Sequence, residues 1–152
     1  MKILMVCLGN ICRSPLAEGI LQDKLNTKGL DIEVSSAGTG GWHVGQAPDT
    51  RAVALAKKYG IDISQQKARQ FSVSDFEDFN LIYAMDGSNL SDIIALANTK
   101  EHIEKVKLIL NEIAPNTDHA VPDPYYGEDD GFENVYQLLN EACEIITNKT
   151  SQ

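Results

Sequence analysis

Apolar positions along the chain alternate between short continuous runs and stretches with helical spacing. Residues 3–6 form a continuous apolar run of strand length. Apolar residues then recur three and four positions apart after Ser14, at Leu16, Ala17, Ile20, Leu21 and Leu25. This pattern predicts a buried strand, a tight loop and then a helix. Ser14 is suited to cap that helix and Pro15 to occupy its first position, where a missing N–H costs nothing.

The same alternation continues to the end of the chain. Further strands are predicted at residues 32–37, 81–85 and 106–110. Further helices are predicted at residues 49–59, 71–79, 90–97 and 132–146. Strands that alternate with helices imply a parallel sheet covered on both faces, with right-handed crossovers. The expected fold class is therefore α/β.

Length and composition favour one compact domain. The 152 residues have the usual size of a single domain, and 43% of them are hydrophobic, which is ordinary for a globular protein. No apolar stretch is long enough to span a bilayer. We therefore expect a single domain over residues 1–152 without a membrane partner.

Net charge and cysteine content narrow the partners further. The formal net charge of −9 disfavours nucleic acid and anionic membranes. Cys7, Cys12 and Cys143 are an odd number of cysteines and cannot form a complete disulfide framework, so we expect a reducing, cytoplasmic location. Cys143 lies on the apolar face of the last predicted helix and is interpreted as a core residue. An anionic ligand would need a local site that overcomes the overall charge.

The segment from Cys7 to Ser14 is the best candidate for such a site. Ligands of open parallel sheets bind outside the carboxyl ends of the strands, and this segment follows the first predicted strand. A turn between strand and helix presents successive backbone N–H groups to one point, and the helix adds its positive end. Gly9 allows close approach or a positive φ, and Asn10 tolerates the left-handed region. Arg13 offers a planar fork for two phosphate oxygens.

Cys7 is a candidate nucleophile within this loop. The field that binds an anion also favours the thiolate form of a cysteine. A lone cysteine is more often a small buried hydrophobe, and this alternative applies to Cys7 taken by itself. The combination with Gly9, Asn10 and Arg13 makes the functional interpretation the stronger one.

Five stretches carry a resemblance to a known family. They are CLGNICRSPLAE, SSAGTGGWHVGQAPDTRA, KARQF, YAMDGSNL and VPDPYYGEDDGFENVY. Together, and in this order, they resemble the low-molecular-weight protein tyrosine phosphatase family over nearly the whole chain. The spacing C-x5-R occurs in other phosphate-binding proteins, but C-x4-C-R-S combined with D-P-Y-Y is highly specific. The resemblance implies a four-stranded parallel sheet flanked by helices on both faces, of flavodoxin-like topology, and hydrolysis of phosphotyrosine and aryl phosphates without metal or cofactor.

The resemblance also implies roles for the residues of the loop. Cys7 is implied to form a phosphocysteine, while Arg13 and the loop amides bind the phosphoryl oxygens and stabilise the transition state. Ser14 is implied to donate a hydrogen bond to the Cys7 thiolate, and Asn10 to brace the loop with the support of Ser36. The other positions expected around the phosphate are Leu8, Gly9, Ile11 and Cys12.

Asp123, between Pro122 and Pro124, matches the family's general acid. The two prolines restrict the local backbone, so the carboxyl can be held in place with little entropy left to lose. Proline-flanked aspartates are more often ordinary turn residues, but the D-P-Y-Y match favours the acid. It is expected to protonate the leaving tyrosine oxygen and then to activate the water that releases inorganic phosphate.

Four further residues bear on substrate choice and redox behaviour. Trp42 and Tyr125 match the family's aromatic wall positions and could stack on the substrate ring. Ile11 stands where relatives that act on phosphoarginine carry threonine, so a phosphotyrosine preference is expected. Cys12 is either a small side chain packed behind the loop or a trap for an oxidised Cys7 as a reversible disulfide; the family pattern supports the second.

Some positions remain without a role or depart from the family pattern. His43 is interpreted as a surface histidine with no assigned role. Gln66 stands where many members have histidine, and Gly87 replaces a common acidic residue. The acidic run 128–130 lacks the ligand spacing of a calcium loop, so no metal site is expected; it is interpreted as solvated surface that repels acidic substrate sequences.

Other functions share parts of this pattern. Arsenate reductases need additional cysteines late in the chain, where only Cys143 occurs. A phosphocysteine-carrying transport subunit would not need Asp123, and a silent phosphotyrosine-binding module would lose the nucleophile or the acid. The expected partners are therefore tyrosine-phosphorylated proteins, with a tyrosine kinase among the candidates.

Overall fold

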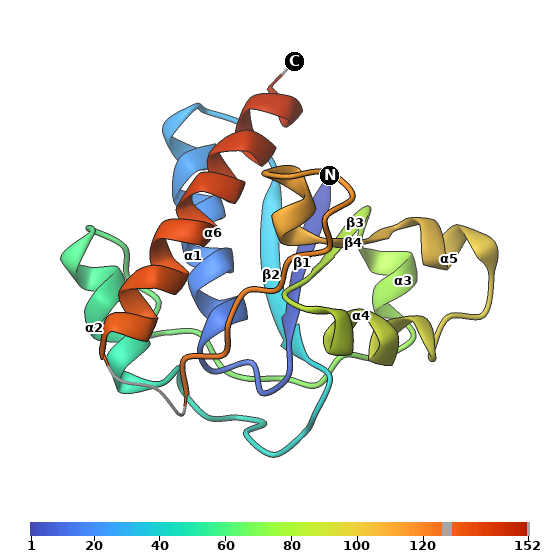
Figure 1. Ribbon diagram of the computed structural model, residues 1–152, viewed down its shortest axis with the longest axis horizontal. Coiled ribbons are helices and arrows are strands. Elements are labelled where there is room, and N and C mark those ends of the chain that lie inside the picture. The colour runs from blue at the N-terminus through green and yellow to red at the C-terminus, as the bar shows by residue number, and fades with distance from the viewer. Residues whose placement is uncertain (126–128, 152) are drawn as a thin grey trace.

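Four parallel strands form the centre of the computed structural model, which describes residues 1–125 and 129–151 apart from the side chains of Asp129 and Asp130. Figure 1 shows the sheet, whose strand order is β2-β1-β3-β4. The strands are β1 (Lys2–Cys7), β2 (Glu33–Gly38), β3 (Leu81–Ala84) and β4 (Val106–Leu108). This is the order of the first four strands of flavodoxin-like sheets, which confirms the predicted fold class.

Helices cover both faces of the sheet (Figure 1). One face carries α1 (Arg13–Thr27), α2 (Thr50–Lys58) and α6 (Asp129–Thr150). The other carries α3 (Asp75–Asp78), α4 (Gly87–Ile94) and α5 (Lys100–Glu104), and a short 3-10 helix, Ile109–Glu112, follows β4. Within the described residues, no helix combines the length and the apolar character needed to cross a membrane.

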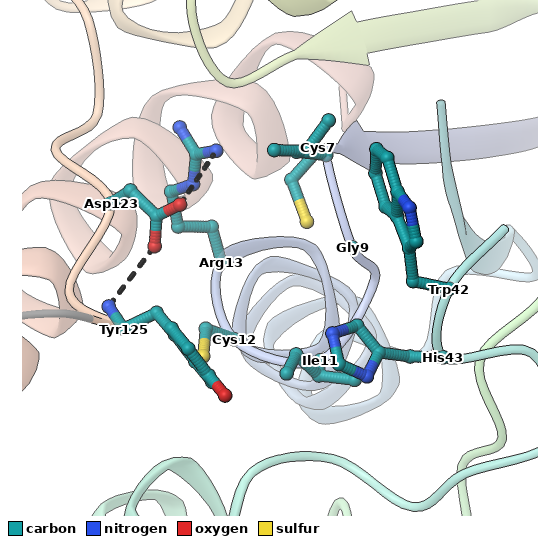
Figure 2. A pocket seen from close by; sticks show the side chains of 10 residues that line it. Cys7, Gly9, Ile11, Cys12, Arg13, Trp42, His43, Asp123 and Tyr125 are labelled. Carbon is teal, nitrogen blue, oxygen red and sulfur yellow. Dashed lines mark hydrogen bonds and ion pairs between the residues drawn. The ribbon is translucent and has the colours of Figure 1, made fainter. Parts of the chain in front are cut away.

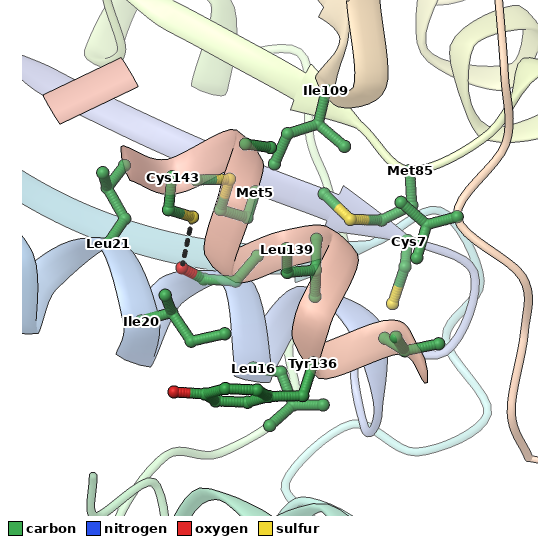
Figure 3. Packing of buried hydrophobic residues seen from close by; sticks show 14 of the residues in the cluster. Met5, Cys7, Leu16, Ile20, Leu21, Met85, Ile109, Tyr136, Leu139 and Cys143 are labelled. Atoms are coloured by element: carbon green, nitrogen blue, oxygen red, sulfur yellow. Dashed lines mark hydrogen bonds between the residues drawn. The ribbon is translucent and has the colours of Figure 1, made fainter. Parts of the chain in front are cut away.

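The central strand β1 is buried on both faces because it contributes to both cores. Ile3, Met5 and Cys7 pack in the core on the side of α1 and α6, whereas Leu4 and Val6 pack in the opposite core. Successive side chains of a strand point to opposite faces, so this alternation follows from the strand geometry. Cys7 is therefore placed at the end of β1 on the side of α1 and α6 (Figure 3).

Cys143 confirms its interpretation as a core residue. Its side chain on α6 is 0% exposed and packs between α6 and α1 (Figure 3). Burial raises the pKa of this thiol to about 12. A neutral thiol enclosed in this way is unreactive.

Several predicted helix and strand ends differ from those observed. The predicted helix 71–79 is helical only at Asp75–Asp78, because the Phe71 N–H bonds to the Gly38 carbonyl at 2.7 Å and extends the sheet edge. Helix α4 starts at Gly87 rather than at residue 90, because the Asp86 carboxylate accepts a hydrogen bond from the Asn89 N–H and caps the helix.

The remaining differences lie in the second half of the chain. Helix α5 was not expected; Thr99 caps it by accepting a hydrogen bond from the His102 N–H. Strand β4 ends at Leu108, two residues before the predicted end, where the 3-10 helix begins. Helix α6 extends beyond the predicted range 132–146 at both ends.

The predicted capping role of Ser14 is wrong. Helix α1 begins at Arg13 and is preceded by Cys12, which makes no side-chain capping bond. The Ser14 hydroxyl is instead bonded to Asn10 and Cys7, inside the protein. Pro15 accordingly occupies the third helical position rather than the first.

Candidate active site

A cavity of about 340 Å³ opens at the carboxyl end of β1 (Figure 2). The chain leaves β1 toward β2 on one side and later returns to β3 on the other, which makes this end of β1 the switch point of the sheet. The cavity is lined by Cys7, Leu8, Gly9, Ile11, Cys12, Arg13, Trp42, His43, Asp123 and Tyr125. All of these except His43 are predicted site residues, so the fold brings together positions far apart in the sequence.

The loop after Cys7 is shaped by the continuation of β2. The N–H groups of Thr39 and Gly40 donate to the carbonyls of Cys7 and Leu8, each at 2.9 Å. A Cβ on Gly38 would lie 2.7 Å from the Leu8 carbonyl oxygen, so only glycine allows this approach. These bonds hold the first two carbonyls of the loop toward the residues that follow β2.

The Cys7 thiol has two hydrogen-bond partners. The Asn10 N–H donates to Sγ at 3.3 Å, and the Ser14 Oγ lies 3.0 Å from Sγ. Ser14 Oγ already accepts a hydrogen bond from the Asn10 side-chain amide at 2.8 Å, so its own proton is available to Sγ. Two hydrogen-bond donors thus face the sulfur of Cys7, a residue that is 3% exposed, and the thiolate is the form of a cysteine that acts as nucleophile.

Asn10 braces the loop in a left-handed conformation, with φ 58°. Its side-chain Nδ2 also donates to Ser36 Oγ at 3.0 Å, and its side-chain Oδ1 accepts a hydrogen bond from the Arg69 N–H at 3.0 Å. Ser36 in turn donates to Glu18 at 2.8 Å, and burial raises the pKa of Glu18. The predicted contact between Asn10 and Ser36 is present, and the structure adds Glu18 to it.

Arg13 is fixed by partners that the sequence did not indicate. Its Nη1 donates to Asp86 at 2.6 Å and to the Val121 carbonyl at 3.0 Å. Its Nη2 lies 3.7 Å from an Asp123 oxygen. A guanidinium that is 3% exposed needs such partners, because an unpaired buried charge is costly. Asp86 lies just after β3, which pairs with β1. Its position after a predicted strand was the feature of the sequence that could have indicated a place near Arg13.

Asp123 projects over the cavity from the loop that enters α6 (Figure 2). The Val121 N–H bonds to the Met85 carbonyl at 2.8 Å, which fixes the start of this loop beside β3. The Tyr125 N–H donates to an Asp123 carboxyl oxygen at 3.0 Å, which orients the carboxyl. A carboxyl oriented in the same cavity as the sulfur is available to exchange a proton with a substrate bound there.

Aromatic side chains form the rim of the cavity. Trp42, which is 71% exposed, and Tyr125 are both at the rim, as predicted. His43 also lines the cavity: its ring centroid is 6.4 Å from that of Tyr125, and its Nδ1 is bonded to Gln46 at 3.0 Å. A Cβ on Gly9 would lie 3.1 Å from the His43 ring, so Gly9 serves close approach and not a positive φ. His43, which was interpreted as a surface histidine with no assigned role, thus forms part of the cavity wall.

Other predicted positions lie outside the cavity or outside the described residues. Gln66 donates to the Pro15 carbonyl at 3.2 Å. Tyr126, Glu128 and the side chains of the acidic run belong to the part of the chain that is not described. In the described part, no group of three or more histidine, cysteine, aspartate or glutamate side chains is arranged to hold a metal ion.

A cavity lined by a cysteine at the end of a strand, by an arginine and by a carboxyl has the composition of cysteine-based phosphate-binding sites. A family model described as low molecular weight phosphotyrosine protein phosphatase matches residues 2–151, and the chain belongs to this family. Its members are protein-tyrosine phosphatases, which are hydrolases. The resemblance inferred from the sequence motifs is thereby confirmed.

Individual relatives and solved structures match nearly the whole chain. A low molecular weight phosphotyrosine protein phosphatase of Schizosaccharomyces pombe is 42% identical over 149 residues, covering 95% of this chain and 94% of the relative. A protein tyrosine phosphatase of Entamoeba histolytica, solved with Hepes in its active site, superposes with a TM-score of 0.93 at 35% identity, covering 99% and 97% of the two chains. The Drosophila arginine phosphatase DARP superposes with a TM-score of 0.92 at 36% identity, covering 100% and 99%.

Proposed function

We propose that this protein tyrosine phosphatase acts through Cys7, Arg13 and Asp123, within a single phosphatase domain over residues 1–152. The observation that carries the proposal is their convergence on one cavity from three separate parts of the fold. Cys7 comes from the end of β1, Arg13 from the start of α1, and Asp123 from the loop before α6. The single family model that spans residues 2–151 supports the one-domain organisation.

In the first step, the Cys7 thiolate attacks phosphorus and the bond to the tyrosine oxygen breaks. Protonated Asp123 gives its proton to that oxygen, so tyrosine leaves as a neutral phenol and the phosphoryl group stays on Sγ. In the second step, the Asp123 carboxylate takes a proton from water, which attacks phosphorus. The sulfur–phosphorus bond breaks, and inorganic phosphate and the thiolate are released.

Arg13 and the loop amides are proposed to hold the phosphoryl oxygens throughout. Since Nη1 of Arg13 is already bonded to Asp86 and Val121, the Nε–Nη2 edge is the part of the fork that would receive two oxygens. Donors that are fixed before the substrate binds need no reorganisation in the transition state. Each such donor is typically worth on the order of 10²-fold to 10³-fold in kcat.

Phosphotyrosine is proposed to be a better substrate than phosphoarginine. The likeness to the Drosophila arginine phosphatase favours the opposite preference. Ile11 presents an apolar side chain to the cavity, and Trp42 and Tyr125 add aromatic surface. A phenyl ring gains from such contacts, whereas a guanidinium needs hydrogen-bond acceptors.

The test of this preference compares kcat/KM on a phosphotyrosine peptide and on a phosphoarginine peptide of the same sequence, with a chelator present. We expect phosphotyrosine to be favoured by about 10²-fold, the scale on which a pocket of mismatched polarity discriminates. The variant Ile11→Thr should narrow that ratio. Faster turnover of phosphoarginine by the wild type would contradict the preference, and loss of all activity with chelator would contradict metal independence.

Two statements about the cellular setting follow from the same chemistry. The nucleophile must stay reduced to work, which supports the proposed cytoplasmic location. Tyrosine-phosphorylated proteins are the substrates of this enzyme class, and the finer proposal is that a tyrosine kinase that carries phosphotyrosine is among them. An arsenate reductase is disfavoured, because Cys143, the remaining cysteine, is enclosed in the core.

Cys12 is proposed to protect Cys7 from irreversible oxidation. Both thiols line the cavity, and they lie close enough to interact electrostatically. After peroxide converts Cys7 to a sulfenic acid, the Cys12 sulfur would attack it, forming a disulfide and releasing water. A thiol reductant would then restore both thiols.

The expected result is reversible inactivation of the wild type by peroxide and much poorer recovery of Cys12→Ser with thiols. Burial, with Asp49 and other negative charges nearby, raises the pKa of Cys12 to about 12. The rate of disulfide formation should therefore increase with pH, by about tenfold per unit while the pH stays below that pKa. Mass spectrometry of the oxidised protein detects the disulfide between Cys7 and Cys12 and measures how fast it forms at each pH. Equal recovery of the two proteins would rule out the protective role.

A further inference from the structure

The Asp123 loop is tied to the rest of the protein at both ends, and the downstream tie is made by Arg51. Upstream, Val121 is bonded to Met85 and Arg13. Downstream, Nη2 of Arg51 donates to the Tyr125 carbonyl at 3.0 Å. Tyr125 also orients the Asp123 carboxyl through its own N–H. The position of Arg51 therefore bears directly on the residue that holds the carboxyl.

Arg51 is itself held in one orientation. Its Nε and Nη2 donate to the two carboxylate oxygens of Asp49, each at 3.0 Å. Its guanidinium lies 4.6 Å from the ring centroid of Phe132 and 5.8 Å from that of Tyr125. A bidentate pair fixes the plane of the guanidinium, and stacking on aromatic rings restricts it further.

Asp49 connects this arrangement to the phosphate-binding loop. Its backbone N–H donates to the Ile11 carbonyl at 2.8 Å, and its carboxylate caps α2 by accepting a hydrogen bond from the Arg51 N–H at 2.8 Å. A continuous path of hydrogen bonds thus runs from Ile11 through Asp49 and Arg51 to Tyr125. One end of the path lies in the loop that carries the nucleophile, and the other lies beside the proposed general acid.

We infer that Arg51 is a positioning residue, which sets the place of the Asp123 carboxyl relative to Cys7 and so the efficiency of proton donation to the leaving group. The inference rests on the proposed function, because it assigns Asp123 as the general acid. Displacement of a reacting group by about 1 Å can cost on the order of 10²-fold in rate. A displaced acid would slow substrates with basic leaving groups most, since these depend most on protonation.

The test compares Arg51→Met with the wild type on phenyl phosphate, which has a poor leaving group, and on 4-nitrophenyl phosphate, which has a good one. We expect kcat/KM to fall by about 30-fold on phenyl phosphate and by about threefold on 4-nitrophenyl phosphate. Arg51→Lys retains the charge but loses the bidentate pair, so its kcat/KM on phenyl phosphate should lie between those of the wild type and Arg51→Met. Lys24→Met is the matched control: it removes the ion pair between α1 and Glu144 of α6, away from the cavity, and should leave both rates unchanged.

Asp49→Asn keeps the inference testable if Arg51→Met does not fold. Asparagine caps helices as well as aspartate but removes the charged partner of Arg51, so the same selective loss is expected on a smaller scale. An equal loss on both substrates, or no loss, in folded variants would overturn the positioning role. If the wild type hydrolyses neither aryl phosphate, the proposed function itself fails, which is a separate outcome.

Discussion

Replacing Cys7 with serine should lower kcat for aryl phosphate hydrolysis on the order of 10⁴-fold or more, the scale expected when a nucleophile is removed. Serine fills nearly the same space beside the Asn10 N–H and Ser14 Oγ, but a hydroxyl is a much weaker nucleophile than a thiol at neutral pH. The fold and the anion-binding loop should persist, so thermal unfolding and inorganic phosphate binding are expected to change little.

The matched control for Cys7→Ser is Cys143→Ala, which removes a buried thiol of the same core that does not line the cavity. At temperatures where both variants are folded, Cys143→Ala should retain the activity of the wild type. Substantial turnover by Cys7→Ser, or an equal loss in both variants, would contradict the assignment of the nucleophile.

Replacing Asp123 with asparagine should lower kcat by about 10²-fold to 10⁴-fold, the usual contribution of a general acid. Asparagine can still accept the hydrogen bond from the Tyr125 N–H, so the loop should keep its place while the transferable proton is lost. The loss should be larger for phenyl phosphate than for 4-nitrophenyl phosphate. Steady-state rates on the two substrates measure it.

Asp118→Asn is the control for this variant, because Asp118 lies exposed in the same connection between the 3-10 helix and α6. Its φ of 56° is in the left-handed region, which asparagine also tolerates. Wild-type rates are expected for Asp118→Asn. An Asp123→Asn enzyme with unchanged rates on phenyl phosphate would show that the proton comes from another group.

The fold could be predicted from the sequence because the apolar pattern and the topology rules act over short distances. Short apolar runs alternate with stretches of helical spacing, and this alternation was sufficient to predict the four strands and their parallel arrangement. Ser14 shows where such reasoning fails. Its sequence position favours a cap, but Asn10 and Cys7 compete for its hydroxyl, and these contacts appear only when β1 and α1 are packed together.

The candidate site was predicted in its main members and missed in its supporting ones. Cys7, Arg13 and Asp123 carry motif information, whereas Asp86 and Arg51 contribute through partners far away in the chain. Asp86 contacts Arg13 across a separation of 73 residues, and Arg51 contacts Tyr125 across 74. A single sequence does not contain such pairings, because they depend on how β3, α2 and the Asp123 loop are packed around β1.

The proposed mechanism is tested most directly by identifying the covalent intermediate. Wild-type enzyme is mixed with an aryl phosphate, denatured during turnover and digested, and the peptide that contains Cys7 is examined by mass spectrometry. We expect a phosphoryl group on Cys7 of the wild type, and no such group in Cys7→Ser under the same conditions. Hydrolysis that proceeds without phosphate on Cys7, or with phosphate on another residue, would contradict the proposed mechanism.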